Sequence, residues 1–397
     1  MLEMGSFEQQ LELELEDLRA AALLRRLRPL ASAHGPRVSY QGRTVIMLSS
    51  NNYLGLAAEP ALKRAATGAI ERWGVGAAAS RLVAGSLELC RELEQRLARL
   101  KGTQAALVFG SGYLANIGVI PALAGSNDII LSDELNHASL IDGCRLAHAT
   151  VRVYRHRDLD HLKVLLQDAR GARRRLIITD SVFSMDGDVA PLADIVELAR
   201  RFNAAVMIDE AHAVGVLGPG GAGLAAALGL QAHIDVQMGT LSKALGSYGA
   251  YVAGSERLVE FLINRARGFI YTTGLAPAMA AAASAALELL EQQPERIRQL
   301  WDNAAYLKER LKDAGFTVMA TDTPILPVLI GSAQAALDLE QALLARNVFV
   351  VAIRPPTVPP GTARLRVTPI ATHSRQDLEQ AAQAFTQCAR ELGLNQR

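Results

Sequence analysis

Gly239-Thr240-Leu241-Ser242-Lys243-Ala244-Leu245-Gly246 places a lysine between two glycines and beside two hydroxyl side chains. The stretch directly follows the apolar run 234–238, which we interpret as a buried strand. A lysine at a strand end is poorly placed for a solvated surface role. It is well placed to form a Schiff base with a carbonyl cofactor that has a phosphate nearby. Most lysines are plain surface charges, so Lys243 indicates such a site only together with residues at other strand ends.

Short apolar runs rich in Val and Ile recur on both sides of this stretch and alternate with helical spacing. Buried parallel strands have this composition, and helices then cover both faces of the sheet. We therefore predict an α/β fold with a mostly parallel central sheet. The predicted strands are 105–109, 129–131, 151–154, 176–179, 204–208, 234–238 and 250–253.

The chain divides into three parts by pattern. Residues 1–50 are expected to be an N-terminal extension, with a helix over 7–28 whose apolar stripe includes Leu11 and Ala22. Residues 51–288 form the large α/β domain. Residues 289–397 are expected to be a smaller α+β domain, because polar helices there alternate with strand-like runs such as 325–330 and 348–353.

Composition excludes several classes of protein. A net charge of +1 leaves no basic surplus for nucleic acid or an anionic membrane. The longest apolar stretches are too short to span a bilayer, and the acidic start is unlike a signal peptide. Three scattered cysteines form neither a metal motif nor a disulfide framework, which favours a cytoplasmic enzyme.

Two strand ends suggest where a phosphate and a planar ring would bind. After 105–109 comes Gly110-Ser111-Gly112-Tyr113 and then a helix, and small residues before a helix N-terminus favour phosphate binding. His137 follows the next strand, where its ring could lie flat on a planar cofactor. Taken alone, neither feature indicates a binding site. Turns such as 110–113 are common and many bind nothing, and His137 could be a surface or helix-capping histidine.

Asp209 and His212 lie at the most informative strand end after Lys243. A carboxylate that closes an apolar strand needs a partner, and a protonated pyridine nitrogen is one. His212 would then donate to a phenolic oxygen of the same ring. A magnesium-binding carboxylate would require a phosphate loop ending in Gly-Lys-Ser/Thr, which the chain lacks. A purely structural Asp–His pair stays open, and the turn 186–188 lacks the further ligands of a calcium site.

The order of phosphate turn, histidine, aspartate and lysine is that of fold-type-I enzymes that use pyridoxal 5'-phosphate (PLP). Seven stretches spread over about residues 20 to 385 resemble the α-oxoamine synthase family. They are Asn51-Asn52-Tyr53-Leu54-Gly55-Leu56, Ser111-Gly112-Tyr113-Leu114-Ala115-Asn116, Leu131-Ser132-Asp133-Glu134-Leu135-Asn136-His137-Ala138-Ser139, Phe183-Ser184-Met185-Asp186-Gly187-Asp188, Asp209-Glu210-Ala211-His212, Thr240-Leu241-Ser242-Lys243 and Arg354-Pro355-Pro356-Thr357-Val358-Pro359.

The resemblance implies roles for these residues. Lys243 matches the lysine that carries PLP, Asp209 and His212 match the partners of the ring nitrogen and phenolic oxygen, and His137 matches the stacking histidine. Further cofactor contacts are implied at Gly112, Tyr113, Ser184 and Thr240.

Substrate contacts are implied by the same resemblance. Asn51 and Arg366 match residues that bind the amino-acid carboxylate, a task suited to the two parallel donors of arginine, although Arg366 could instead form a structural ion pair. Arg25 matches an arginine near the acyl substrate, Thr357 matches a substrate contact in the small domain, and His137 is expected to touch substrate as well. Family members are homodimers with shared active sites, so Thr273 is expected to reach the partner's cofactor phosphate.

One stretch departs from the family pattern. Gly76-Ala77-Ala78-Ala79-Ser80-Arg81 stands where many relatives have Gly-Ser-Gly-Gly-Ser. Alanine adopts a positive φ less readily than glycine, so the geometry of this loop near the acyl substrate is in question.

The family reaction is a decarboxylative condensation of an amino acid with an acyl-CoA, which makes the chain a PLP-dependent C-acyltransferase. Lys243 would be the base that removes the α-proton. The stretches 325–330, 269–277 and 354–357 resemble the biotin-synthesis branch, which joins L-alanine to pimeloyl-CoA or a pimeloyl carrier protein. The alternatives are 2-amino-3-ketobutyrate CoA ligase, 5-aminolevulinate synthase, serine palmitoyltransferase or a member of broad specificity. A non-catalytic partner subunit would lack Lys243.

Overall fold

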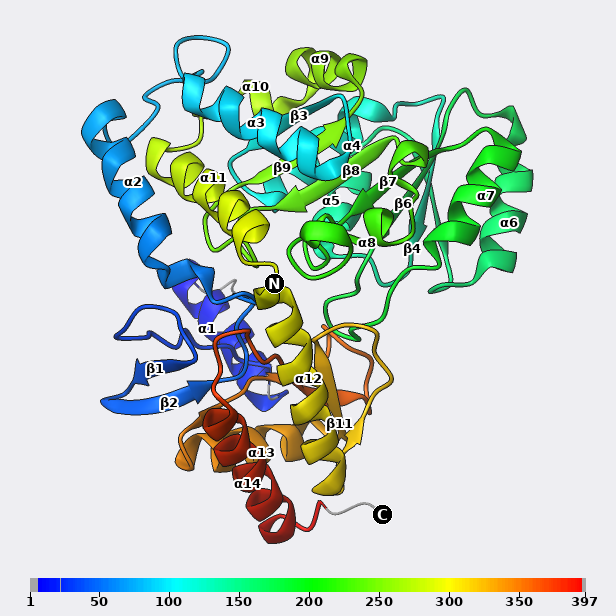
Figure 1. Cartoon of the computed structure of the whole chain (residues 1–397). Coiled ribbons are helices and arrows are strands. Elements are labelled where there is room, and N and C mark those ends of the chain that lie inside the picture. Colours follow the sequence, from blue (N-terminus) through cyan, green and yellow to red (C-terminus); the bar gives the residue numbers. More distant parts are fainter. Residues whose placement is uncertain (1–5, 22, 395–397) are drawn as a thin grey trace.

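The structure is a computed structural model that describes residues 6–21 and 23–394. Figure 1 shows a larger α/β half and a smaller half that contains the C-terminal helix α14 (Arg375–Glu391). The long helix α12 (Glu295–Asp313) runs through the smaller half, below the junction. Candidate functional residues come from both halves.

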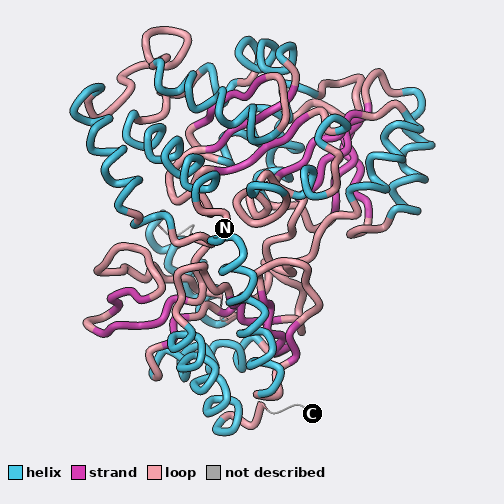
Figure 2. The backbone as a smooth tube through the Cα atoms, in the orientation of Figure 1, coloured by secondary structure: helices cyan, strands magenta, loops and turns pink. Residues whose placement is uncertain are grey.

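A seven-stranded sheet forms the centre of the larger half (Figure 2), in the order β3-β9-β8-β7-β6-β4-β5. All its neighbouring pairs are parallel except those of β9, which runs antiparallel to β3 and β8. Each predicted strand is present. The strands are β3 (Ala105–Phe109), β4 (Ile129–Asp133), β5 (Thr150–Tyr154), β6 (Arg175–Asp180), β7 (Ala205–Asp209), β8 (Val236–Thr240) and β9 (Ala250–Gly254).

Alternating side chains of these strands build two apolar cores, one on each face of the sheet. Ile177 and Ile208 face one core, while Ile178 and Met207 face the other. Helices α2 (Pro60–Trp73), α3 (Glu88–Lys101), α6 (Leu159–Asp168), α7 (Leu192–Phe202) and α11 (Pro277–Gln292) pack on the first core. Helices α4 (Gly112–Leu123), α5 (Ala138–Leu146), α9 (Glu256–Arg265) and α10 (Arg267–Ile270) pack on the second. The expectation of helices on both faces is therefore confirmed.

The C-terminal part has a sheet of its own, in the order β10-β11-β14-β13. Its strands and helices enclose a separate apolar core that includes Leu307, Leu365 and Phe385. Its elements are β10 (Thr317–Val318), β11 (Leu326–Gly331), α13 (Ala333–Ala345), β13 (Ala352–Ile353), β14 (Ala363–Val367) and α14 (Arg375–Glu391).

One predicted strand of this part is two strands. The run 348–353 divides into β12 (Val348–Phe349) and β13, which belong to different sheets. β12 pairs in parallel with β2 (Arg43–Met47), and β2 forms a hairpin with β1 (Arg37–Tyr40). The turn of this hairpin has positive φ at Gln41 and Gly42, which suits a tight two-residue connection.

The N-terminal helix is shorter than the sequence pattern predicts. α1 spans Phe7–Ala20, and the amides of Leu23 and Leu24 both turn back to the carbonyl of Leu18. Its apolar stripe is exposed, because no residue of α1 is buried against the rest of the chain. Ala22, which the stripe was expected to include, lies outside the described residues, as do the terminal positions of the two outer predicted domains. The boundaries at residues 50 and 288 stay predictions.

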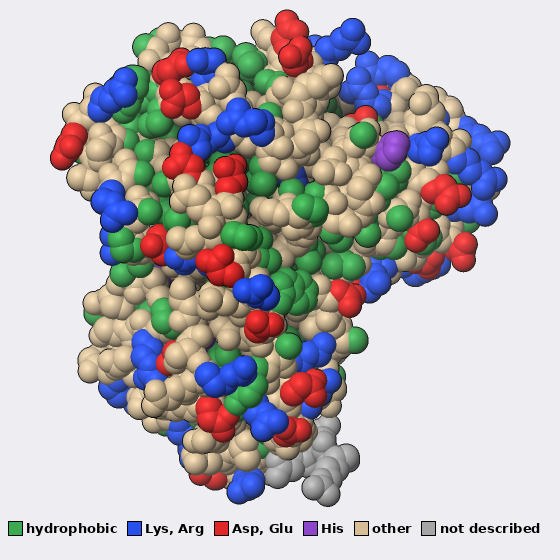
Figure 3. All heavy atoms as spheres, viewed as in Figure 1, with side chains coloured by type: hydrophobic (Ala, Val, Ile, Leu, Met, Phe, Trp, Pro, Cys, Tyr) green, Lys and Arg blue, Asp and Glu red, His purple; other side chains and the backbone are tan. Residues whose placement is uncertain are grey.

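The surface carries both signs of charge. Figure 3 shows Lys and Arg side chains interspersed with Asp and Glu on the visible face. Within residues 6–21 and 23–394, no helix has the length and apolar character needed to cross a membrane.

Candidate active site

The predicted functional strand ends meet at one edge of the sheet. β4, β6, β7 and β8 are parallel, so their carboxyl ends lie side by side, and Asp180 of β6 is the register partner of Asp209 of β7. Loops after the carboxyl ends of such strands form the usual binding crevice of open α/β sheets. Here those loops carry His137, Ser184, His212 and Lys243.

Lys243 lies in the loop after β8, with its Nζ 2.9 Å from Nε2 of His212. Burial disfavours the charged amine and lowers its pKa to about 8, although the nearby Asp209 and Asp180 act in the opposite direction. At pH 7 about a tenth of this amine is therefore uncharged, far more than for an exposed lysine with a pKa of about 10.4. An uncharged amine is what a nucleophile or a proton acceptor requires.

His212 links Lys243 to the smaller half of the molecule. Its Nδ1 lies 2.6 Å from the hydroxyl of Tyr53, which accepts a hydrogen bond of 3.3 Å from Nη2 of Arg366. Burial lowers the pKa of His212 well below its usual value, with help from the charges of Lys243 and Arg366. The ring is thus neutral, with one donor and one acceptor nitrogen between the tyrosine and the lysine.

Asp209 is buried and oriented by two donors. The side chain of Asn116 donates to Oδ2 at 2.9 Å, and the amide of Ala211 donates to Oδ1 at 2.9 Å. Asn116 also donates to the hydroxyl of Ser139 at 2.9 Å. Burial and the charge of Asp209 raise the pKa of Asp180 well above its usual range. The proximity of the two acids therefore disfavours the charged form of Asp180.

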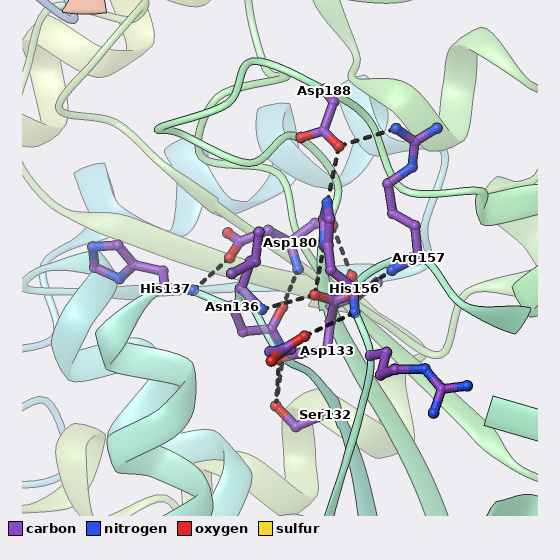
Figure 4. Close-up of polar contacts among 12 residues, drawn as sticks. Ser132, Asp133, Asn136, His137, His156, Arg157, Asp180 and Asp188 are labelled. Carbon is purple, nitrogen blue, oxygen red and sulfur yellow. Dashed lines mark hydrogen bonds and ion pairs between the residues drawn. The ribbon is translucent and has the colours of Figure 1, made fainter. Parts of the chain in front are cut away.

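His137 is the N-cap of α5 and faces solvent. Its backbone amide donates to Asp180 at 2.6 Å, and Nδ1 lies 2.8 Å from the hydroxyl of Ser139. In Figure 4 its ring points away from the polar cluster behind it. This placement leaves one face of the ring free to stack on a ligand.

The predicted phosphate turn lies beside the end of β8. Ser111 caps α4 by accepting a hydrogen bond of 3.1 Å from the amide of Leu114. A Cβ added to Gly112 would lie 2.9 Å from Met238 and 4.0 Å from Oγ1 of Thr240, so only glycine fits here without displacing its neighbour. Thr240 Oγ1 is also 2.7 Å from the hydroxyl of Ser242. Hydroxyl groups and a helix N-terminus thus come together, which favours anion binding.

Arg366 of β14 joins two other predicted residues. Its Nη1 donates to Oδ1 of Asn51 at 3.1 Å, and its Nε donates to the carbonyl of Ser184 at 2.5 Å. The guanidinium is buried at the junction of the two halves. A buried guanidinium without a carboxylate partner among these contacts suits recognition of a substrate carboxylate.

Four predicted residues lie apart from this group. Arg25 donates to the hydroxyl of Thr357 at 3.3 Å, and both line a hollow of about 800 Å³ beside β12 and β13. Tyr113 is exposed and bonds Asp142 rather than the strand ends. Thr273 is exposed and pairs with Ser80, without a hydrogen bond to the Lys243 group.

Four residues of the site were not singled out from the sequence. Tyr53 and Asn116 lie inside stretches that carry the family resemblance, so the stretches located them without revealing their contacts. Asp180 closes an apolar strand as Asp209 does, and the same reasoning would have found it. Ser139 closes the stretch that contains His137, so the resemblance located it as well without revealing its contact with Asn116.

Comparison with known proteins identifies the family. A sequence profile of the family described as Aminotransferase class I and II matches residues 43–385. The chain belongs to this aminotransferase class I and II family. The observed sheet confirms the expected fold-type-I architecture, which structural relatives share.

Several curated relatives of this chain carry the same name. The 8-amino-7-oxononanoate synthase of Geobacter sulfurreducens is 53% identical over 96% of this chain and 98% of its own length. The enzyme of the same name from Symbiobacterium thermophilum is 49% identical over 96% of this chain and 97% of its own. The sequence resemblance to α-oxoamine synthases is therefore confirmed.

Solved structures of relatives superpose closely. A serine palmitoyltransferase from S. paucimobilis with bound PLP matches with a TM-score of 0.93 and 31% identity, over 98% of this chain and all of that one. The 8-amino-7-oxononanoate synthase of Francisella tularensis matches with a TM-score of 0.74 and 27% identity, over 87% of this chain and 98% of that one.

Proposed function

We propose that this chain is an 8-amino-7-oxononanoate synthase, a PLP-dependent transferase of biotin biosynthesis. It condenses L-alanine with pimeloyl-CoA or a pimeloyl carrier protein and releases CO2, CoA and 8-amino-7-oxononanoate. The observation that carries this proposal is the near-full-length identity of about half to curated enzymes of that name. The grouping of Lys243, Asp209, His212 and Arg366 supports it.

The residues present fit PLP. An amine of lowered pKa, a buried carboxylate and a turn rich in donors are the groups that such an aldehyde, pyridine ring and phosphate require. Lys243 would hold the aldehyde carbon, Asp209 the ring nitrogen and His212 the phenolic oxygen. Ser111, Gly112 and Thr240 would lie at the phosphate.

When bound, PLP supplies a carbonyl carbon for an amine and a positively charged ring that accepts an electron pair. Asp209 would keep the ring nitrogen protonated, because a buried carboxylate favours a cation beside it. Asn116 holds that carboxylate in place. His137 would cover one face of the ring and exclude water from it.

The amino acid would be held by its carboxylate, through Arg366 with Asn51 beside it. That contact turns the α-carbon toward Lys243, whose uncharged Nζ would accept the α-proton. Arg366 is hydrogen bonded to Tyr53, and Tyr53 to His212, so carboxylate binding is linked to the groups around the lysine. Arg25 and Thr357 would contact the acyl substrate from the adjacent hollow.

We further propose a cytoplasmic homodimer with shared active sites, to which Thr273 contributes across the interface. The three-part division at residues 50 and 288 belongs to the same proposal. Among the residues that the structure describes, no three or more His, Cys, Asp and Glu side chains form a group that could hold a metal ion.

The high TM-score to serine palmitoyltransferases favours a second candidate, the condensation of serine with a long-chain acyl-CoA. Purified protein should be mixed with alanine, glycine or serine, each with pimeloyl-, acetyl- or palmitoyl-CoA, and thiol release followed. We expect alanine with pimeloyl-CoA to be fastest. Preference for serine with palmitoyl-CoA, or glycine with acetyl-CoA, would replace the proposal. Lys243→Ala is the control and should abolish both turnover and the visible lysine-linked absorbance.

A further inference from the structure

A histidine outside the proposed mechanism lies between two loops of the active site (Figure 4). His156 follows β5, and its Nδ1 is 2.8 Å from Oδ1 of Asp133 while its Nε2 is 2.9 Å from Oδ2 of Asp188. The ring also packs edge-on against Phe183, with centroids 4.4 Å apart. We refer to Asp133, His156 and Asp188 as the His156 bridge.

The geometry of this bridge requires a charged ring. An ionised carboxylate only accepts hydrogen bonds, so both ring nitrogens must donate, and a neutral imidazole has a single N–H. The other charged groups nearby are Arg157, whose Nη1 donates to Asp188 at 3.0 Å, and Glu134, which accepts from the backbone amide of His156 at 3.3 Å.

The surroundings also favour the charged form. Burial alone would lower the pKa of His156, but the hydrogen bonds and charges of Asp133 and Asp188 outweigh it and raise the pKa to about 9. The pKa of Asp188 is lowered by His156 and Arg157 in spite of burial. The surroundings of His156 therefore favour the protonated ring that its two hydrogen bonds require.

Asp133 connects the bridge to the loop of His137. It closes β4, and its Oδ1 accepts from the amide of Leu135 at 2.9 Å while its Oδ2 accepts from the amide of Arg157 at 3.0 Å. The carbonyl of Asp133 accepts from the amide of Asn136. The turn that ends at His137 thus depends on the position of this carboxylate.

Asp188 connects the bridge to the loop of Ser184. The backbone carbonyl of Asp188 accepts from the amide of Phe183 at 3.0 Å, which closes the loop 183–188. At the other side of this loop, the carbonyl of Ser184 accepts from Arg366, and the carbonyl of Gly187 accepts from Thr321 at 2.6 Å. The bridge therefore supports the surface on which Arg366 rests.

We propose that His156, as a cation, is a positioning residue that fixes the His137 loop relative to the Ser184–Arg366 contact and thereby supports binding of the amino-acid substrate. It touches neither the substrate nor the cofactor and acts through Asp133 and Asp188. The part about the amino acid rests on the proposed function, whereas the fixing of the two loops does not depend on it.

His156→Gln removes the charge and keeps a single donor group, and Asp188→Asn removes one charge and keeps an acceptor. Exposed His233→Gln is the matched control. In cofactor-free protein, we expect the backbone amides of residues 183–188 to exchange with deuterium roughly tenfold faster in His156→Gln than in the wild type. This is the effect expected from the loss of one charge-assisted hydrogen bond. Asp188→Asn should act in the same direction, and the control should match the wild type.

The PLP-loaded protein gives the second readout. Spectral titration with alanine, glycine and serine should show affinity for the preferred amino acid roughly tenfold weaker in His156→Gln by the same argument. In the wild type that affinity should fall as pH rises through about 9, where His156 loses its proton. The variant should lack this step.

Two outcomes would overturn the proposal. In the first, His156→Gln changes neither the deuterium exchange of residues 183–188 nor the affinity for the amino acid. In the second, His156→Gln lowers the melting temperature but leaves the pH dependence of amino-acid affinity unchanged. The second would leave His156 a merely structural residue. If His156→Gln fails to fold, Asp188→Asn decides by the same readouts, with its pH step expected below that of the wild type. Wild-type protein that releases no thiol from either pimeloyl-CoA or a pimeloyl carrier protein would instead reject the proposed function and leave the exchange result valid.

Discussion

The amine of Lys243 has an unusual environment for a lysine, since it is partly buried and contacts a neutral imidazole. Its pKa of about 8 compares with about 10.4 for an exposed lysine. Mixing cofactor-free protein with PLP should therefore give a lysine-linked absorbance whose rate of appearance rises with pH and levels off above about 8. Stopped-flow absorbance at a series of pH values measures it, and a midpoint near 10 would contradict the burial argument.

Single residues also show what the sequence could predict. The roles of Lys243, Asp209 and His212 were inferred from residue type and strand position, and the structure places all three together. Tyr53 and Asn116 could not be inferred this way, because their importance lies in contacts across distant parts of the chain. Such contacts depend on how the two halves and the helices pack.

At the scale of elements, the alanine loop 76–81 contains a strained turn. Ala78 has φ +59°, and the amide of Ala79 donates to the carbonyl of Ala77 at 2.7 Å. Replacing Ala78 with Gly should relieve the strain and stabilise the fold by about 0.5–1 kcal/mol.

Ala79→Gly is the matched control for this loop. Ala79 is not among the residues of positive φ, so glycine there should only add freedom to the unfolded chain and lower stability. Thermal melting of both variants tests the prediction, and equal shifts in the same direction would show that the turn is not strained.

A fully buried ion pair fixes the chain directly after Asp209. Lys101, the last residue of α3, donates to the carboxylate of Glu210 and to the carbonyl of Ala222, and Glu210 also accepts from the amide of Ala225. Lys101→Met would leave a buried carboxylate without its cation, so we expect a loss of about 3–5 kcal/mol in stability.

Adding Glu210→Gln should recover part of that loss, because it removes the unpaired charge and keeps an acceptor for Ala225. Urea denaturation of the wild type, both single variants and the double variant gives the coupling energy. A Lys101→Met variant as stable as the wild type would contradict the prediction.

Elements differ in how well the sequence predicts them. Six of the seven central strands were predicted because each is a short run that is buried along most of its length. The edge strand β5 is largely exposed, and it was predicted from its Val and Tyr residues alone. The run 348–353 has the same local signal, yet its two ends join different sheets, and no local pattern encodes that division. The helix over 7–28 stops at Ala20 although its spacing continues, since its apolar stripe finds no partner in the same chain.

At the scale of the whole molecule, a group of exposed apolar side chains is where we expect the interface of the proposed homodimer. Leu82, Val83 and Tyr271 are 53%, 80% and 71% exposed, and their two segments are joined by the Ser80–Thr273 pair. Groups of this kind on a surface often bind another chain. We expect light scattering to give about 85 kDa, twice the 42.5 kDa of one chain.

Val83→Asp should shift this mass toward that of one chain, because a charge in an apolar interface is costly to bury. His233→Gln, on an exposed surface elsewhere, should leave it unchanged. A wild-type protein that is monomeric and fully active would exclude an active site shared between subunits.

The pairing of β12 with β2 has a consequence for biosynthesis. The hairpin at residues 37–47 leaves the ribosome early, yet the strand that completes its sheet begins at residue 348. Until then the edge of β2 offers unpaired backbone groups to other nascent chains. Translation must almost finish before this edge is protected, so the edge stays open to pairing between chains during most of synthesis.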